Sequence, residues 1–154
     1  VAVGSYTVSA LVVANPVGSV IDPGTGKLWG DPARPPVDLA AFGALEHPAS
    51  SLNTTIGVIA TDAPVTVAQV TRLAMVGHDG IARAVRPAHS PLDGDTLFAV
   101  STAATAGQTT GVGVETLHDL SAAAADAVQA AIVDAVVSAA PGHGLGVWSA
   151  ILAD

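Results

Sequence analysis

Apolar residues occur in short runs along the chain, and three of these runs have the composition of β-strands. Residues 6–14 are rich in Val, Ala and Leu and stop at an Asn-Pro pair. Residues 55–61 are apolar on both faces, which is typical of a strand buried between two layers. Residues 96–102 follow an Asp-Gly turn dipeptide. The pattern therefore predicts these three strands, with a shorter fourth strand at 17–21 beside the first.

Two longer segments have the apolar spacing of amphipathic helices instead. Thr66 and Gln69 match the capping box T-x-x-Q, and the helix that follows should end near Val85, because Pro87 disfavours helical backbone just before it. The second segment, 121–140, is rich in Ala and stops at a Pro-Gly pair. Strands grouped with amphipathic helices predict α/β layers, with helices packed on a sheet or a pair of sheets.

The segments between these elements predict loops. Residues 22–53 hold five of the ten prolines and four glycines, which indicates a long, irregular and mobile connection of a kind that is usually functional or disordered. Residues 105–113 are rich in Gly and Thr and predict a loop with some strand, and the tail 143–154 has no clear assignment.

The composition favours one domain whose core consists of small apolar residues. The chain has 154 residues, 50% of them hydrophobic, but only 3% are aromatic, so Ala, Val, Ile and Leu must fill the core. A formal net charge of −8 without a basic stripe repels phosphate, and we expect no nucleic-acid partner. The absence of cysteine excludes disulfides, thiolate nucleophiles and Cys-based metal sites, and it fits the cytoplasmic location that we expect.

Residues 1–21 carry no charge, yet we expect no membrane segment there. Gly, Ser, Asn and Pro interrupt the stretch, which has neither a basic flank nor a small-residue cleavage signature. Buried strands explain its apolar character instead. The chain starts at Val1 rather than Met, so we expect a fragment or a processed product.

The pair Asn53-Thr54 lies where the predicted loop meets a predicted buried strand. A threonine hydroxyl is a weak nucleophile until a base takes its proton, and a free α-amino group on the same residue can serve as that base. That amino group exists only after the preceding peptide bond is broken, so the junction must be cleavable. An ordinary strand-opening threonine is the alternative for Thr54, and Thr55 is the neighbour most easily confused with it.

Further polar residues lie at the ends of predicted strands. Asp93 and Asp95 come just before residues 96–102, where two carboxylates two residues apart can face one site. The alternative is a turn residue and a solvated strand cap. Asn15 ends the first predicted strand and offers an amide donor, or it forms only a turn with the proline that follows.

The histidines and glycines give weaker signals. His78 lies near the end of a predicted helix, where a structural role in the helix dipole is favoured. His89 is close in sequence to the acidic pair and is a candidate substrate contact, with local hydrogen bonding as the alternative. The five histidines lack a metal-binding spacing, and the glycine-rich stretch 107–113 lacks the Lys-Ser/Thr of a phosphate loop. We therefore expect no metal and no cofactor.

Residues 53–102 contain N-T-T-x-G-V-x-A-T, H-D-G-x-A-R and D-G-D-T-x-F, and residues 9–18 read SALVVANPVG. This combination resembles the self-processing aminopeptidases that act on D- and β-amino-acid peptides. Within that family of N-terminal-nucleophile hydrolases, it looks most like the nylon-oligomer (6-aminohexanoate oligomer) endohydrolases. The aminopeptidase branch commonly has Ser and a Ser-x-Glu pair where this chain has Thr54 and Asp93-x-Asp95, which favours the nylon-oligomer branch.

The resemblance implies a fold and a set of site residues. The fold is α+β, a four-layer αββα sandwich of which this chain is the C-terminal part. The chain is cut between Asn53 and Thr54, so that 1–53 closes the larger subunit and 54–154 forms the small subunit. Thr54 is the nucleophile, Asp93 and Asp95 are the acidic residues, and Asn15 supplies the oxyanion-stabilising amide.

The resemblance also implies partners. Family precursors carry a long segment before the part that matches Val1, and that segment supplies further sheet and active-site residues. We therefore expect the upstream segment of the same precursor as a partner, and a homo-oligomer, commonly a tetramer. An isolated piece would leave sheet edges unpaired.

The function expected from these residues is hydrolysis of linear amides through Thr54 and an acyl-enzyme. The expected substrates are 6-aminohexanoate oligomers, with an aminopeptidase for D- or β-amino-acid peptides as the alternative. Two alternatives of other classes are an acyltransferase of the ornithine acetyltransferase type and an inactive subunit kept for assembly.

Overall fold

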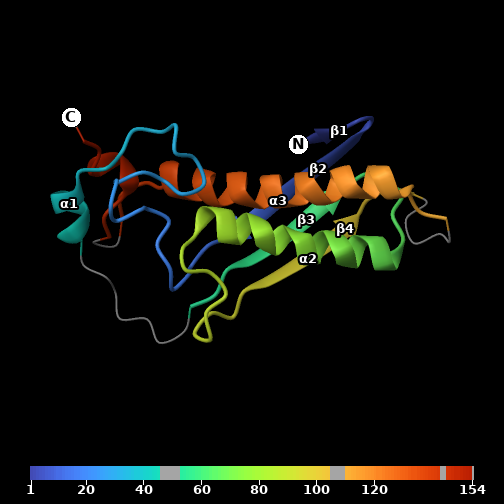
Figure 1. The fold of residues 1–154 in the computed structure, drawn as a ribbon, viewed down its shortest axis with the longest axis horizontal. Helices are drawn as coiled ribbons and strands as arrows, with labels where there is room; N and C mark the ends of the chain where they lie inside the picture. The colour runs from blue at the N-terminus through green and yellow to red at the C-terminus, as the bar shows by residue number, and fades with distance from the viewer. Residues whose placement is uncertain (46–52, 105–109, 143–144, 154) are drawn as a thin grey trace.

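The computed structural model describes residues 1–45, 53–104, 110–142 and 145–153. In this part of the chain two long helices lie side by side along a four-stranded sheet (Figure 1). The elements in chain order are β1 (Ala2–Val3), β2 (Tyr6–Val13), α1 (Leu39–Gly43), β3 (Ile56–Thr61), α2 (Val67–Ala84), β4 (Thr96–Ser101), α3 (Val114–Val137) and the 3₁₀ helix η1 (Trp148–Ala150). The predicted strands 6–14, 55–61 and 96–102 are confirmed, each shorter by one residue at one end.

The sheet has the strand order β1-β2-β3-β4. Neighbouring strands are antiparallel except β3 and β4, which are parallel because α2 carries the chain back between them. Val13 at the end of β2 pairs with Ile56 at the start of β3, and Ile56 pairs with Thr96 at the start of β4. The end of β2 and the starts of β3 and β4 therefore meet at the same end of the sheet.

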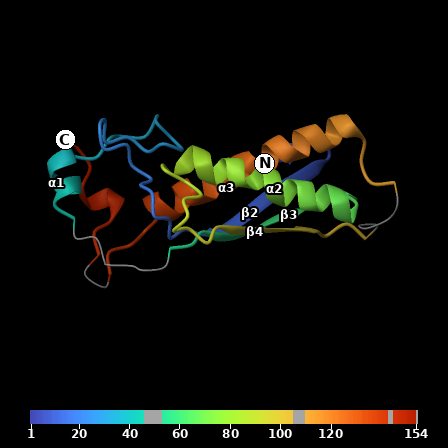
Figure 2. The same cartoon turned by 60° about the horizontal axis from the view of Figure 1, so that its bottom comes forward.

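The two long helices lie on one face of the sheet (Figure 2), and the main core lies between them and that face. Strand residues Val8 and Ile59 and helix residues Leu73, Ile81 and Val128 are fully buried there. Small residues let the layers approach closely. A Cβ atom on Gly80 of α2 would lie 2.2 Å from the backbone oxygen of Ala125 in α3, so this helix contact requires glycine.

The opposite face of the sheet is apolar but uncovered in the part of the chain that the structure describes. Leu11 and Val13 are each 71% exposed, and Ile56, Phe98 and Val100 are also exposed. The sequence pattern predicts that residues 55–61 are buried on both faces. In the described chain helices cover only one side of β3, and the second layer, which we expect from a partner segment, stays a prediction.

The predicted start of α2 is confirmed in detail. The Thr66 hydroxyl accepts a hydrogen bond from the Gln69 N–H at 3.2 Å, and the Gln69 side chain accepts one from the Thr66 N–H at 3.0 Å. The Gln69 amide also donates to the Val112 carbonyl at 2.7 Å, so the cap ties the start of α2 to the segment before α3.

The last helix differs from its predicted bounds of 121–140. It begins seven residues earlier, at Val114, and ends at Val137. Its N-cap is Gly113, which makes no side-chain cap hydrogen bond, so the sequence gives no N-cap signal there. By length and composition alone α3 could cross a membrane, but Leu120 and Ile132 are fully buried and the helix packs on α2 and β2.

The predicted strand at 17–21 is wrong. After β2 the chain leaves the sheet, and Ser19 makes an isolated antiparallel bridge with Arg86. A Cβ atom on Gly18 would lie 2.0 Å from the Pro87 oxygen, which shows how tightly the two segments pass. Ile21 bridges to Leu28 instead of joining the sheet.

The long connection 22–53 is irregular, as predicted, apart from α1, and its residues 46–52 lie outside the described residues. Ile21, Leu28 and Val37 form a second small core with Val133 of α3. In the predicted loop 105–113, residues 105–109 lie outside the described residues, and 110–113 contain no strand. The tail contains η1 and a bridge between Leu152 and Val37, with 143–144 and 154 outside the described residues.

Candidate active site

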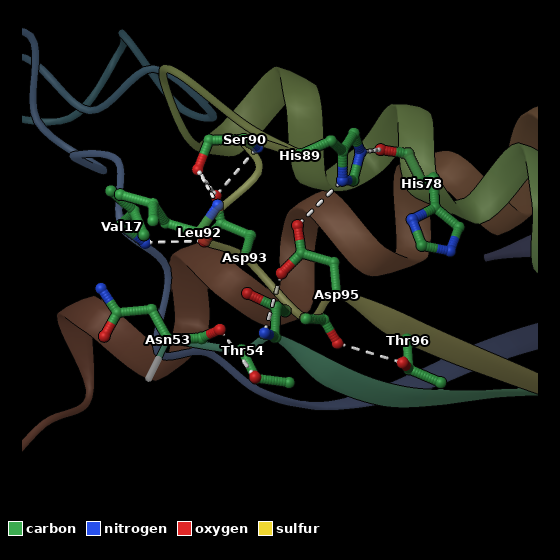
Figure 3. A network of polar contacts seen from close by, with 12 residues as sticks. Val17, Asn53, Thr54, His78, His89, Ser90, Leu92, Asp93, Asp95 and Thr96 are labelled. Atoms are coloured by element: carbon green, nitrogen blue, oxygen red, sulfur yellow. Dashed lines mark hydrogen bonds and ion pairs between the residues drawn. The ribbon is translucent and has the colours of Figure 1, made fainter. Parts of the chain in front are cut away.

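The sequence-predicted residues converge at the end of the sheet where β2 ends and β3 and β4 begin. Asn15 follows β2, Thr54 precedes β3, and Asp93 and Asp95 precede β4. Asn53 forms a parallel bridge with Asp93, which extends the β3–β4 pairing beyond the strands themselves. Figure 3 shows this network from close by.

The Asn53–Thr54 peptide is fixed at both of its polar atoms. The Thr54 N–H donates a hydrogen bond to the Asn15 carbonyl at 2.8 Å, and the Gly94 N–H donates to the Asn53 carbonyl at 2.9 Å. The Thr54 hydroxyl donates to the same Asn53 carbonyl at 2.6 Å (Figure 3). The hydroxyl thus lies against the carbonyl group of the peptide bond that it would have to attack.

The position of Gly94 adds a steric constraint on Thr54. A Cβ atom at residue 94 would lie 2.8 Å from the Thr54 hydroxyl oxygen. Glycine at this position therefore leaves room for the hydroxyl while its N–H reaches the Asn53 carbonyl. Sequence reasoning treats Gly94 only as part of a turn, and its role as a donor has no signal in a single sequence.

Thr54 and Thr55 differ in accessibility. Thr54 is partly exposed, whereas Thr55 is fully buried, and its hydroxyl has no hydrogen-bond partner among the described residues. Of these two threonines, only Thr54 has a hydroxyl that a substrate could approach. The geometry therefore favours Thr54 over its neighbour as the candidate nucleophile.

Asp95 lies beside the residue that follows Thr54. One of its carboxylate oxygens accepts the Thr55 N–H at 2.9 Å, and the other lies 2.8 Å from His89 Nδ1. The Asp95 side chain is only 4% exposed. Its carboxylate is therefore anchored between the start of β3 and the loop that carries His89.

Asp93 points toward a different part of the site. Its carboxylate accepts the Val17 N–H at 2.9 Å and both the hydroxyl and the N–H of Ser90, at 2.7 and 3.0 Å (Figure 3). Burial raises the pKa of Asp93, but these hydrogen bonds and the charge of His89 outweigh it and hold the pKa below its usual value. The contacts join the segment after β2 to the loop before β4, so in the uncut chain Asp93 organises the site.

Asn15 contributes its backbone, since its carbonyl accepts the Thr54 N–H, and its side chain is exposed. The predicted role of its side-chain amide toward an oxyanion stays a prediction. His89 and His78 lie next to each other with ring centroids 5.0 Å apart. Burial, followed by the charge of His89, lowers the pKa of His78 below its usual value. Within the described ranges, no three His, Asp or Glu side chains are grouped to hold a metal ion.

The fold resembles solved structures of N-terminal-nucleophile hydrolases. One is the L-aminopeptidase D-Ala-esterase/amidase of Ochrobactrum anthropi, a variant of the Ntn hydrolase fold, with a TM-score of 0.61 and 29% identity. The match covers 87% of this chain and 36% of that one. The mixed α/β architecture of the described residues agrees with the expected α+β class.

The model of peptidase family S58 matches residues 1–147, and the chain belongs to this family. An uncharacterized aminopeptidase of Mycobacterium leprae is 44% identical over 148 residues, which cover 86% of this chain and 41% of that protein. A 6-aminohexanoate-oligomer endohydrolase of Kocuria sp. is 33% identical over 108 residues, which cover 64% of this chain and 30% of that protein. The chain thus spans less than half the length of these relatives.

The family expected from the sequence motifs is therefore confirmed. The narrower resemblance to nylon-oligomer endohydrolases has weaker support, because the mycobacterial aminopeptidase shares higher identity over more of the chain.

Proposed function

We propose that this chain carries the catalytic centre of an amide hydrolase that activates itself by cutting the Asn53–Thr54 bond. The observation that carries the proposal is the Thr54 hydroxyl, 2.6 Å from the Asn53 carbonyl oxygen, with the Gly94 N–H on the same oxygen. Membership of peptidase family S58 supports the reaction class.

The proposed processing step moves the Asn53 acyl group from nitrogen to oxygen. The Thr54 hydroxyl oxygen bonds to the Asn53 carbonyl carbon, the C–N bond breaks, and the hydroxyl proton goes to the departing nitrogen. The Gly94 N–H stabilises the negative charge that develops on the Asn53 oxygen. Water then hydrolyses the ester, which leaves an Asn53 carboxylate and a free α-amino group on Thr54.

Processing would prepare the same groups for substrate. The Thr54 amino group becomes the base for its own hydroxyl, which attacks a substrate amide carbonyl and releases the amine. When the Asn53 carbonyl leaves, the Gly94 N–H becomes available for the substrate oxygen, together with the amide of Asn15. Hydrolysis of the acyl-Thr54 ester by water completes the cycle.

We propose linear amides as the substrate class, with 6-aminohexanoate oligomers as the first candidate. A cavity of about 540 Å³ is lined by Ala14 and Pro16, the chain neighbours of Asn15, and by apolar side chains that include Val17, Val20, Phe42 and Val136. Such a lining suits the methylene chain between two amides. An aminopeptidase for D- or β-amino-acid peptides is the second candidate, because the relative named as an aminopeptidase has the higher identity.

The proposal extends to the whole molecule. Residues 1–53 would end the larger subunit and 54–154 would form the smaller one. A preceding segment of the same precursor would complete an αββα sandwich by covering the open face of the sheet, and several copies would assemble into a homo-oligomer such as a tetramer. The exposed apolar residues on β2, β3 and β4 support a covering layer.

Thr54→Ala tests the central step. The intact gene product should separate into two pieces, one of which begins at Thr54, whereas the Thr54→Ala protein should stay uncut and inactive. Thr54→Ser keeps a hydroxyl and should still be cut. Intact mass and N-terminal sequencing give the result, and an active, fully processed Thr54→Ala protein would disprove the assignment. A second experiment measures turnover of 6-aminohexanoate oligomers and of D- and β-amino-acid peptides, which distinguishes the two substrate classes. Repeating it with an added amine acceptor detects acyl transfer.

A further inference from the structure

His89 is the residue near the site with the most unusual conformation and contacts. It is the only non-glycine residue with a positive φ among the described residues, at 55°. Its Nδ1 lies 2.8 Å from an Asp95 carboxylate oxygen, and its Nε2 lies 3.2 Å from the His78 carbonyl oxygen. Both ring nitrogens thus have partners within the protein, and the substrate contact expected from the sequence stays a prediction.

The two partners of the His89 ring define its protonation. A carbonyl oxygen only accepts hydrogen bonds, and an ionised carboxylate does the same, whereas a neutral imidazole has only one N–H to donate. If both contacts are hydrogen bonds, the His89–Asp95 pair must hold one extra proton. The extra proton lies either on His89, which makes an ion pair, or on Asp95, which makes a neutral pair. The second Asp95 oxygen accepts the Thr55 N–H, which favours the ionised carboxylate and therefore the charged ring.

The surrounding charges agree with this assignment. The ionisable groups that face the two rings are Asp93 and Asp95 from the loop before β4 and His78 and Asp79 from α2. Three of these four are carboxylates. Burial and the charge of His89 lower the pKa of His78, so the neighbouring ring adds little positive charge beside His89.

We infer that His89 is a positioning residue that, as an imidazolium, holds Asp95 against the Thr55 N–H and so fixes the start of β3 beside Thr54. The inference rests on the proposed function for its effect on cleavage, but the protonation and the contacts of His89 are independent of it. The contact to the His78 carbonyl anchors the same ring to α2. His89 thus links α2 to the peptide that follows the nucleophile.

The first test reads the ring directly in the uncut Thr54→Ala form of the intact gene product. Long-range ¹H–¹⁵N correlation of the His89 imidazole should show both nitrogens protonated at neutral pH. A neutral ring there would overturn the inference. Because this sample cannot be cut under the proposed function, and the readout needs no activity, the result stands whether or not Thr54 proves to be the nucleophile.

The second test compares His89→Asn with His89→Gly in the protein with Thr54. Both residues tolerate the positive φ, so the backbone is not strained in either variant. Asn keeps one amide donor that can reach Asp95, whereas Gly keeps none. We expect processing by the Gly variant to slow by about 10- to 100-fold, which corresponds to loss of one charge-assisted hydrogen bond, and the Asn variant to stay close to the wild type at neutral pH.

The pH dependence of the processing rate distinguishes a positioning role of His89 from a purely stabilising one. A charged ring donates to both partners, whereas a neutral ring donates to only one, and the Asn side chain has no such change of charge. Processing by the wild type should therefore show a pH-dependent step that His89→Asn lacks. His78→Gln removes the neighbouring ring but leaves the His78 carbonyl in place, and it should keep the wild-type profile. Equal rates for the Gly and Asn variants, or an unchanged profile in His89→Asn, would overturn the inference.

Discussion

At the scale of single residues, Gly94 connects the turn before β4 to the reacting peptide. Its N–H holds the Asn53 carbonyl, and a side chain at this position would meet the Thr54 hydroxyl at 2.8 Å. We expect Gly94→Ala to slow processing by about 100-fold, because it displaces the nucleophile. Gly43→Ala is the matched control, since a Cβ at Gly43 meets nothing within 4 Å, and it should process normally. Gel electrophoresis of samples taken over time measures the rate of cleavage. Equal rates for the two variants would contradict the role of Gly94.

The two aspartates should behave differently when each is replaced by Asn. Asp95→Asn should slow processing by about 100-fold, because Asp95 anchors the peptide after Thr54. Asp93→Asn should mainly lower the free energy of unfolding. The folded-state pKa of Asp93 is depressed, so its stabilising contribution is full above the ordinary carboxyl pKa and is lost as the pH falls through the depressed value. Urea unfolding at several pH values should show a difference in the free energy of unfolding between wild type and Asp93→Asn, and this difference should disappear in acid. A difference that does not depend on pH would contradict the prediction.

The sequence pattern places Thr54, Asp93, Asp95 and Asn15 at the ends of predicted strands, and the family resemblance groups them into one site. It does not separate the tasks of the two aspartates. Asp93 bonds to the distant Val17 N–H, and Asp95 bonds to the distant Thr55 N–H, so the difference between them depends on contacts that form only in three dimensions. Contacts made by the backbone, such as the N–H of Gly94, leave no trace in residue types.

At the scale of elements, the sequence succeeds where a local pattern decides the structure. β2, β3, β4 and α2 have strong apolar periods, and α2 also has its capping box. The failures lie where long-range contacts decide. Residues 17–21 are apolar enough for a strand but pair with Arg86, and α3 starts at a glycine N-cap with no side-chain signal. β1 is only two residues long and has no pattern of its own.

Gln69 tests how far the cap of α2 stabilises the molecule. Its side chain bonds the Thr66 N–H, the Val112 carbonyl and the Val112 N–H. Gln69→Ala should lower the free energy of unfolding by about 1–3 kcal/mol, because it removes the cap and leaves Val112 unpaired. Thr71→Ala changes an exposed residue of the same helix and should cost no more than about 0.5 kcal/mol. Denaturant unfolding gives both values, and similar losses for both variants would show that the cap contributes little.

At the scale of the whole molecule, the open face of the sheet should govern association. We expect the intact gene product to sediment as an oligomer at low micromolar concentration, with Leu11 and Phe98 covered. Leu11→Lys places a charge on this face and should disrupt the assembled protein, whereas Met75→Lys, on an exposed position of α2, should not. A stable, soluble monomer of the intact gene product with full activity would contradict the proposed assembly.

The hydrogen bonds that hold the Asn53–Thr54 peptide also affect whether its cleavage can be reversed. Cleavage of a neutral peptide creates a carboxylate at Asn53 and an ammonium group at Thr54. The new carboxylate forms where Asn53 is bridged to Asp93, close in the chain to Asp95, so like charges push it away. The ammonium group stays beside the Asn15 carbonyl that already holds its nitrogen. The Asn53 carboxylate is repelled while the Thr54 ammonium group is held in place, so the two ends do not rejoin easily. The acidic surroundings of the junction would therefore make maturation irreversible.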